Sequence, residues 1–369
     1  MKNTFGSSVT VTLFGESHGD CVGAVLDGLA PGIPVEDDYI RRRLAARRPQ
    51  GTVSTARREP DEFSILSGVF DGRTTGTPLC IRIPNTDTDS TEYEKNRTIP
   101  RPGHADYAAV CKYHGYADYR GGGHFSGRLT AALTAAGAVL LSALEAHGIF
   151  IGTHILRCKD AADRPFAHDP QSDLDQLRAA AFPVLEPRAA EAIQDTIRTA
   201  GAAGDSVGGI LQTAVTGLPA GVGEPWFDTV EGLLAHALFS IPAIKGVEFG
   251  DGFSLASMTG SQANDAFTVK GGRVATVTNH NGGINGGITN GMPLIFQCAV
   301  KPTPSIAVEQ DTVDLAAMQP CRISVGGRHD PAVLHRAVPV VDSVTAITIC
   351  DLLATRFGTD WPQALQRET

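Results

Sequence analysis

The sequence predicts an α+β fold, in which strands and helices mix without a strict strand–helix–strand rhythm. Three observations favour this class: alternating apolar runs typical of half-buried strands, a few long helical patterns, and the lack of any repeat or clear linker. The chain has 369 residues, is 42% hydrophobic and 19% charged, and so resembles a packed globular protein. We expect one domain over residues 1–369, with 159–187 as a candidate peripheral excursion because it is rich in Asp, Pro and Ala.

The N-terminal region predicts two strands followed by a helix. Apolar and polar residues alternate over Ser8–Phe14 with the period of a half-buried strand. The polar loop Gly15–Gly19 follows, and then a second apolar strand over Cys21–Leu26. Residues Glu36–Arg48 predict a helix, because Pro34 precedes them, acidic residues occupy the first turn and arginines the last.

The longest helical pattern is Gly127–His147, which is rich in alanine and leucine and can end at Gly148. Its apolar part, Ala131–Leu144, is interrupted by small polar residues and is too short to span a bilayer. Further helices are expected over Pro187–Ala203, Asp228–Phe239 and Val341–Phe357, and further strands over Gly208–Thr216, Gly246–Ser257 and Pro293–Ala299.

Charge and cysteine content narrow the class of protein. A formal net charge of -9 disfavours attraction to nucleic acid or to an anionic membrane, so neither partner is expected and an anionic ligand requires local basic clusters. The seven cysteines are scattered without a Cys-x-x-Cys pair, which indicates reduced thiols in a cytoplasmic protein and no metal site. Residues Met1–Gly6 lack the apolar stretch of a signal peptide.

Histidines concentrate in polar loops that contain glycine, and several lie beside arginine. Histidine is the side chain best suited to proton transfer near neutral pH. A single histidine in such a loop is more often a structural residue, but six of the eleven in similar settings indicate an active site. These six are His18, His104, His114, His124, His280 and His329.

Basic and glycine-rich segments predict anion binding. Five arginines within 41–48, followed by Arg57 and Arg58, are typical either of a solvated helix end or of phosphate and carboxylate recognition by planar guanidinium groups. The glycine run in Arg120–Arg128 leads directly into the long helix, where a helix N-terminus can bind an anion. The glycines of Asn279–Gly291 allow backbone amides to lie against a planar or phosphorylated ligand.

Three more motifs place charged groups beside histidine or proline. In Arg101–Tyr107, Asp106 follows His104 by two residues and can orient its imidazole. Lys301–Ser305 is a stiff turn that carries a cation and hydroxyls, and Gly326–Pro331 joins base, acid and guanidinium. With no Walker loop and no strand-borne G-x-G-x-x-G, a nucleotide-dependent phosphotransferase is disfavoured, and we expect an enzyme acting on another phosphorylated anion.

Taken together, these segments resemble the chorismate synthase family. The resemblance covers nearly the whole chain and implies helices sandwiched between antiparallel β-sheets, usually in a homotetramer. The segments that carry it, in order, are Phe14–Gly19, Arg47–Pro49, Thr74–Thr77, Arg101–Tyr107, Arg120–Arg128, Asn279–Gly291 with Lys301–Ser305, and Gly327–Pro331.

The resemblance implies a lyase that converts 5-enolpyruvylshikimate 3-phosphate to chorismate and phosphate by 1,4-anti elimination, the last common step of aromatic amino-acid biosynthesis in the shikimate pathway. Such enzymes require reduced FMN without net redox change; the flavin donates an electron transiently and takes the C6 hydrogen at N5. NADPH would be used only if the enzyme reduces its own flavin. The alternative is a non-catalytic flavin-binding relative, which would be expected to have lost some of the catalytic residues.

The resemblance also implies a role for individual residues. His18 is similar to the acid that helps the phosphate leave, His104 to the histidine that protonates or polarises the reduced flavin, and Asp330 to the carboxylate that relays the proton from flavin N5. Ser17 and Ser126 resemble hydroxyls near substrate and flavin. The implied substrate-binding residues are Arg47, Arg48, Arg128 and Arg328. The implied FMN-binding residues are His124, Phe125, Ser126, Pro242, Ala243, Gly286, Lys301, Pro302, Thr303, Pro304, Ser305 and Arg328.

The sequence departs from the commonest family pattern at the glycine loop. His124–Ser126 stands where the family has Arg-Ser-Ser, and Arg128–Thr130 where it has Arg-Glu-Thr. An arginine that the family has near residues 53–54 is missing. Because that arginine belongs to a proposed flavin-reductase site, its absence argues against a built-in NADPH-dependent reductase.

Overall fold

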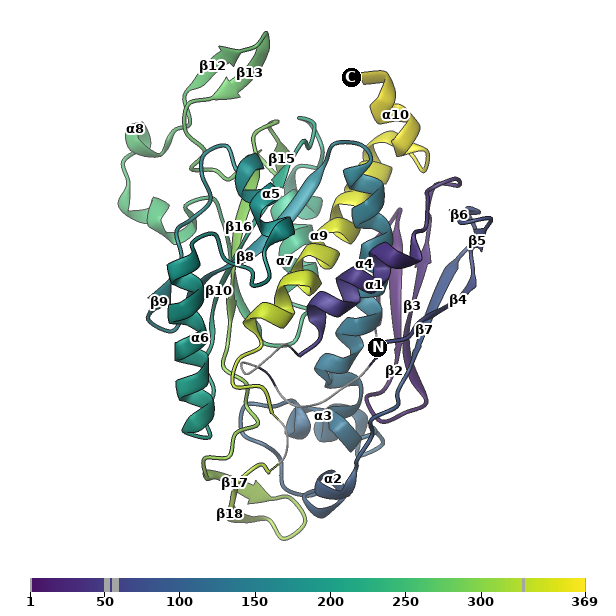
Figure 1. Cartoon of the computed structure of the whole chain (residues 1–369), viewed down its shortest axis with the longest axis vertical. Helices are drawn as coiled ribbons and strands as arrows, with labels where there is room; N and C mark the ends of the chain where they lie inside the picture. Colours follow the sequence, from purple (N-terminus) through teal and green to yellow (C-terminus); the bar gives the residue numbers. More distant parts are fainter. Residues whose placement is uncertain (1, 50–53, 55–59, 327–328, 369) are drawn as a thin grey trace.

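The computed structural model describes residues 2–49, 54, 60–326 and 329–368. Two five-stranded antiparallel sheets enclose a layer of helices (Figure 1). The α+β class is therefore confirmed, and so is the arrangement of helices between sheets.

The first sheet is built from the N-terminal part of the chain, in the strand order β1-β2-β3-β7-β4. Both strands predicted in this region form and pair with each other, with Leu13 opposite Ala24. A short hairpin, β5–β6, extends beyond the sheet. The bounds are β1 Thr4–Phe5, β2 Thr10–Gly15, β3 Cys21–Asp27, β4 Ser64–Ser67, β5 Val69–Phe70, β6 Arg73–Thr74 and β7 Leu79–Pro84.

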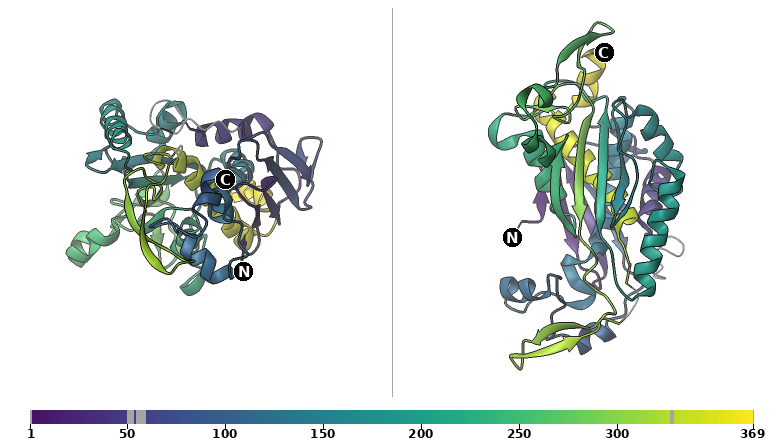
Figure 2. Two further views of the ribbon diagram at one scale, coloured as in Figure 1. Left: turned by 90° about the horizontal axis from the view of Figure 1, so that it is seen from below. Right: turned by 90° about the vertical axis from the view of Figure 1, so that its left-hand side faces the viewer.

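The second sheet has the order β11-β16-β10-β8-β9 and comes from the later part of the chain. Two hairpins, β12–β13 and β17–β18, project at opposite ends of the long axis (Figures 1 and 2). The bounds are β8 Phe150–Cys158, β9 Ala161–Ala162, β10 Gly209–Thr216, β11 Ile244–Phe249, β12 Phe267–Lys270, β13 Arg273–Thr276, β14 Ile284–Asn285, β15 Ile288–Thr289, β16 Leu294–Val300, β17 Gln310–Asp314 and β18 Gln319–Ile323.

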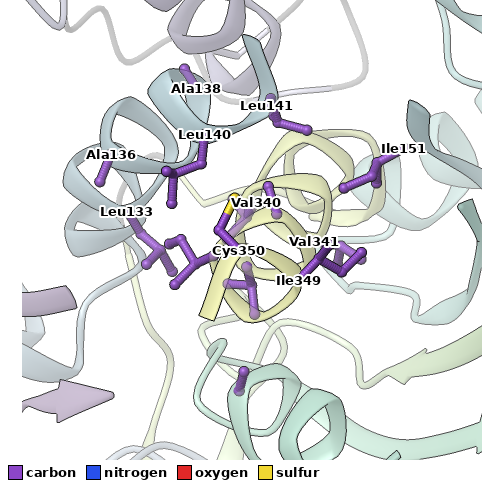
Figure 3. Close-up of a cluster of buried hydrophobic side chains, with 14 of the residues drawn as sticks. Leu133, Ala136, Ala138, Leu140, Leu141, Ile151, Val340, Val341, Ile349 and Cys350 are labelled. Carbon is purple, nitrogen blue, oxygen red and sulfur yellow. The ribbon is translucent and has the colours of Figure 1, made fainter. Parts of the chain in front are cut away.

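Four helices form the layer between the sheets: α1 (Asp37–Arg47), α4 (Thr130–Glu145), α7 (Val230–Leu238) and α9 (Leu334–Phe357). Helix α4 packs on β3 and β7, α9 packs on β8 and β10, and the two helices pack against each other. Figure 3 shows small and aliphatic side chains of both helices at this contact. The helices approach closely because Gly137 faces Ser343, where any Cβ would overlap the serine.

The remaining helices lie outside this layer. Helices α2 (Thr91–Lys95) and α3 (Asp106–Tyr113) lie at the end that carries β17–β18, and α5 (Gln171–Ala179) and α6 (Pro187–Ala202) pack on the second sheet. The segment 159–187 contains β9 and α5, and the Asp163 carboxylate anchors it by accepting backbone N–H groups of Arg164, Leu185 and Glu186. The short α8 covers Gly260–Ala263, and α10 covers Trp361–Glu368.

Two predictions of secondary structure need correction. The strand predicted over Gly246–Ser257 ends at Phe249 and gives way to a 3-10 turn, because Gly250 and Gly252 have φ of 56° and 49°, which no strand allows. Helix α9 begins at Leu334 rather than Val341, although Pro339 lies inside it. Burial of its first turns in the core compensates for the N–H that proline lacks.

Two helical segments, Gly127–Glu145 and Leu334–Phe357, are long and apolar enough to cross a membrane by length and composition. In the fold, 89% of an 18-residue apolar stretch in each of these segments is buried, as is usual for core helices.

The two ends of the chain are tied together by one carboxylate. Asp351 of α9 accepts the backbone N–H groups of Ser7, Ser8 and Val9 at 2.6–3.1 Å. These donors precede β2, so the N-terminal sheet is fastened to the last long helix.

Candidate active site

Most of the predicted site residues lie at one end of the molecule, where α2, α3 and the N-termini of α4 and α9 are found (Figure 1). His18 lies there on the loop between β2 and β3, beneath the glycine run Gly121–Gly123. The three glycines have φ of 61°, 83° and 54°, a region that favours glycine. A Cβ at Gly121 would overlap the His18 ring and would lie 2.8 Å from Ser17 Oγ. The glycine run therefore packs directly on these two side chains.

The His18 ring is oriented from both sides. Its Nδ1 lies 2.8 Å from Ser90 Oγ, and the Tyr93 ring meets it edge-on with centroids 5.4 Å apart. Nε2 is therefore the nitrogen that faces Gly121. The neighbouring Ser17 is fully buried, and its Oγ has no hydrogen-bond partner within the part of the chain that the structure describes. A buried hydroxyl of this kind is a group on which a ligand can form a hydrogen bond.

His104 forms a cluster with Asp106 and Arg101 on the other side of the glycine run. Its Nδ1 lies 2.6 Å from Asp106 Oδ1, which is the contact predicted from their spacing. Arg101 donates to both oxygens of Asp106 at 2.8 Å. Burial opposes ionisation of Asp106, but hydrogen bonds from Arg101 and His104 outweigh it and hold the Asp106 pKa well below its usual range. Asp106 is therefore ionised and fixes Nδ1 of His104 as a proton donor.

His104 Nε2 points toward the glycine run, since a Cβ at Gly122 would lie 3.6 Å from it. The consecutive glycines 121 and 122 thus contact His18 and His104 respectively. Two imidazoles and one buried hydroxyl therefore meet at one strip of backbone that carries no side chains.

The Lys301–Ser305 turn packs on the loop that carries His104. Lys301 Nζ donates to the Gly103 carbonyl, and Arg101 reaches Ser305 Oγ at 3.3 Å. A cavity of about 300 Å³ lies beside the turn, lined in part by Lys301, Pro302, Thr303 and Pro304. Thr303 Oγ1 and Gln310 Nε2 are buried at this cavity without a hydrogen-bond partner among the described residues.

Three of the predicted arginines surround one carboxylate. Arg47 and Arg128 are buried and both contact Asp61, and the half-exposed Arg48 approaches it at 3.7 Å. Arg128 also donates to Asn85 Oδ1 at 2.9 Å. The Asn85 amide in turn donates to carbonyls of the loop that carries His18. The arginine cluster is thereby connected to the histidine.

Asp330 lies near the start of α9, where it pairs with Arg336. Arg336 Nε also donates to the Arg47 carbonyl at 3.0 Å, so Asp330 is tied to the arginine cluster. Burial lowers the pKa of the neighbouring His329, whose Nε2 lies 3.0 Å from the Gly326 carbonyl. The predicted Arg328 lies outside the described residues.

Part of the predicted FMN set lines a second cavity of about 320 Å³ between β1, β2, α4, α7 and α9. His124, Ser126 and Pro242 line it, together with mainly apolar side chains. Ser126 caps the turn before α4 by accepting the Arg128 N–H at 3.3 Å, and Phe125 packs edge-on against Tyr113. A backbone hydrogen bond joins the segments that line the two cavities. The Lys301 N–H donates at 2.9 Å to the carbonyl of Ala243, the residue after Pro242.

Three residues predicted as candidates lie elsewhere. Gly286 lies in the tight turn between β14 and β15, near the start of β16, whereas Lys301 follows the end of that strand. At the usual rise per residue, the length of β16 separates Gly286 from Lys301 by about 20 Å. His280 contacts Asp251 at 2.5 Å beside the same hairpin, and His114 ends α3 with φ of 55°. Within this chain these residues do not join the site.

Sequence reasoning missed Asp61 and Asn85, which organise the arginines, and Ser90 and Tyr93, which orient His18. Only an indirect signal for Asp61 was present: a row of arginines that would be buried requires a carboxylate partner. Among the described residues, no group of three or more His, Cys, Asp or Glu side chains could hold a metal ion.

Comparisons with known proteins agree on one family. The sequence profile described as "Chorismate synthase" matches residues 9–354. The chain is 47% identical over 351 residues to a chorismate synthase of Thermococcus kodakarensis, covering 95% of this chain and 97% of that one. It is 43% identical over 360 residues to one of Dehalococcoides mccartyi, covering 97% and 98%. A solved structure titled "Crystal Structure of Chorismate Synthase" matches with a TM-score of 0.76 at 26% identity, covering 98% of this chain and 97% of the other.

Proposed function

Since the chain belongs to the chorismate synthase family, we propose that it converts 5-enolpyruvylshikimate 3-phosphate to chorismate and phosphate by 1,4-anti elimination, with reduced FMN and no net redox change. The observation that carries this proposal is the convergence of His18, Ser17 and His104 on Gly121–Gly122, beside a buried cluster of arginines. Such a site offers both a proton donor and cationic groups to a leaving phosphate.

The arginine cluster supplies the charge that the substrate needs. Asp61 neutralises only part of the positive charge of Arg47, Arg48 and Arg128. Guanidinium groups bind phosphate and carboxylate oxygens with a planar set of donors, and each charge-assisted hydrogen bond contributes about 1.5–3 kcal/mol. His18 is linked to this cluster through its loop and, in the proposal, its Nε2 donates a proton to the departing phosphate.

The residues beside Lys301 fit the phosphate end of FMN. Lys301 provides a cation, and the Thr303 hydroxyl and Gln310 amide, which have no hydrogen-bond partner among the described residues, provide two buried donors in a cavity of about 300 Å³. An anion with several acceptor oxygens would satisfy these donors. When bound, reduced FMN supplies an electron-rich ring that promotes loss of the phosphate and of the C6 hydrogen.

His104 and Asp330 are proposed to handle the second proton. Asp106 holds the His104 Nδ1 proton, which leaves Nε2, 3.3 Å from an Arg101 nitrogen, as the nitrogen toward the glycine run. Asp330 is kept in place by Arg336 and accepts the proton that comes from C6. The apolar cavity lined by His124, Ser126 and Pro242 would exclude water from the flavin ring.

The test is an anaerobic assay of the intact enzyme with photochemically reduced FMN and 5-enolpyruvylshikimate 3-phosphate. We expect release of phosphate and the appearance of chorismate in equal amounts. Because the flavin is reduced beforehand, the result does not depend on NADPH or on a flavin-reductase activity. A folded enzyme that releases no phosphate under these conditions contradicts the proposal.

The alternative, a non-catalytic flavin-binding relative, makes a different prediction for His18→Ala. If the chain is a catalyst, this variant loses turnover by about 10²–10⁴-fold, the usual contribution of general acid catalysis, and retains FMN affinity. If the chain only binds flavin, wild type and variant behave alike in both measurements. Spectral titration of FMN with substrate present measures the binding side.

We also propose that the enzyme is a cytoplasmic homotetramer, as the family resemblance implies. Large apolar side chains that are exposed in the single chain support this assembly, among them Trp226, Phe227 and Phe253, because a partner subunit would cover them. Light scattering coupled to size-exclusion chromatography tests the assembly, and a monomer at micromolar concentration would contradict it.

A further inference from the structure

Asn85 connects the two halves of the proposed active site. It follows β7 directly, and its backbone N–H donates to the Asp20 carbonyl at 3.2 Å. Its side-chain Oδ1 accepts a hydrogen bond from Arg128 Nε at 2.9 Å. Its Nδ2 donates to the carbonyls of Glu16 and Gly19 at 2.9 and 2.8 Å. One amide thus contacts both sides of the short loop that carries His18.

The chemistry of the three partners explains why an asparagine stands here. A guanidinium group offers only donors, and a backbone carbonyl offers only acceptors. The Asn85 amide must therefore place its oxygen toward Arg128 and its nitrogen toward the loop. An aspartate could keep the contact with Arg128 but has no donor for the Glu16 and Gly19 carbonyls.

The contacts that remain without Asn85 differ on its two sides. Arg128 would still be held by Asp61 and by the Pro84 carbonyl, to which it donates at 3.1 Å. The loop carrying His18 would keep the bond from the Ser17 N–H to the Gly123 carbonyl and the contact of His18 with Ser90, but its Glu16 and Gly19 carbonyls would lose the donor that joins them. Because Arg128 keeps a charged partner in Asp61, we expect loss of the Asn85 amide to shift the loop more than the arginine.

We propose that Asn85 is a positioning residue that sets the distance between the proton donor His18 and the phosphate-binding Arg128. The inference rests on the proposed function, because it assigns Asn85 a role in that reaction. It acts through the His18 loop and contributes to the proton-transfer step rather than to substrate binding. A displacement of about 1 Å at a reacting group can lower the rate by about 10²-fold.

The test compares Asn85→Ala and Asn85→Asp with wild type in the anaerobic phosphate-release assay. Both variants are expected to lower kcat by about 10- to 100-fold, with a smaller change in the KM for the substrate. The control is Asn96→Ala, since Asn96 also donates its amide to a carbonyl, that of Glu92, but directly follows α2 and contacts neither the His18 loop nor Arg128 in the bonds described. Thermal melting and FMN affinity establish that each variant is folded.

A double-mutant cycle separates positioning from a structural effect. If Asn85 acts through His18, Asn85→Ala has little further effect on kcat in a His18→Ala background. Equal fold-losses in both backgrounds overturn the inference, as does a wild-type kcat in the folded Asn85→Asp variant. An inactive wild type would overturn the proposed function, whereas an active wild type with these outcomes overturns only the role of Asn85.

Discussion

One turn of α1 separates two arginines with different surroundings. Arg43 pairs with Asp342 of α9, one guanidinium with one carboxylate. Arg47, four residues later on the same face of the helix, shares Asp61 with Arg128 and Arg48. Among the described residues, the second cluster therefore has three cations for one anion.

The difference indicates which buried charges are structural and which are functional. In the Arg43–Asp342 pair, the charges compensate each other, and the pair fixes α1 against α9. Around Asp61, the described residues include three cations and one anion, an arrangement suited to binding an anionic ligand. The same helix thus carries an anchor and, one turn away, the proposed binding site for a phosphorylated substrate.

The largest effect is expected when the balanced pair is broken. Asp342→Asn removes the buried carboxylate that pairs with the partly buried Arg43 and should lower the free energy of unfolding by about 3 kcal/mol. Urea denaturation followed by circular dichroism measures this change. The double variant Arg43→Met/Asp342→Leu should recover most of the stability, and a single variant as stable as wild type would show that the pair is not an anchor.

His335, at the α9 end near Asp330 and Arg336, extends the comparison to pH. Burial, aided by Arg336, lowers the pKa of His335 from 6.5 to about 4. Between these values the unfolded chain binds a proton that the folded chain does not, so stability is lost as the pH falls from about 7 to 4. The loss is about 3 kcal/mol from this histidine, and His335→Leu should remove it. Urea titrations at several pH values should then show a shallower dependence, whereas parallel curves for the two proteins would contradict the prediction.

The cationic cluster should respond to mutation through binding more than through stability. Arg128→Met removes charge-assisted hydrogen bonds to substrate worth about 1.5–3 kcal/mol each, so kcat/KM should fall at least about 10-fold per bond. The unfolding free energy of the Arg128→Met variant should fall less than that of Asp342→Asn, because Asp61 still has Arg47 and Arg48 as cationic partners. A large stability loss with unchanged kcat/KM would reverse the assignment of the two clusters.

The smallest effect is expected at the surface of the same helix. Arg41 pairs with Glu62 at 2.9 Å, but the two side chains are 48% and 67% exposed. Arg41→Ala should change the unfolding free energy by less than about 1 kcal/mol and leave kcat/KM unaltered. Arg41→Ala is the matched control for removing an arginine from the protein. A larger change in its unfolding free energy or its kcat/KM would show that loss of net charge alone explains the effects of the Asp342 and Arg128 variants.

Local patterns predicted the parts of the molecule that depend on neighbours in sequence. The helix over Gly127–His147 follows from its alanine- and leucine-rich composition, and the His104–Asp106 contact from a spacing of two residues. The organisation of the site could not be predicted this way, because Asp61 meets Arg128 across 67 residues. Likewise, the family resemblance implies that Gly286 and Lys301 both bind FMN, whereas in this chain the two residues lie at opposite ends of β16. Residue type identified the chemistry, but only the sheet register determines which side chains meet.

The bond between Asp351 and the backbone of residues 7–9 has a consequence for how the protein is made. The strands of the first sheet and α4, which packs on β3 and β7, leave the ribosome early, but the helix that packs on α4 and fastens the start of β2 is among the last segments to be synthesised. During translation, the apolar side of α4 that packs on α9 must wait for that helix, exposed or shielded by chaperones. Truncations that remove α9 should therefore also destabilise the opposite end of the chain, where the backbone of residues 7–9 loses its acceptor and α4 loses its packing partner.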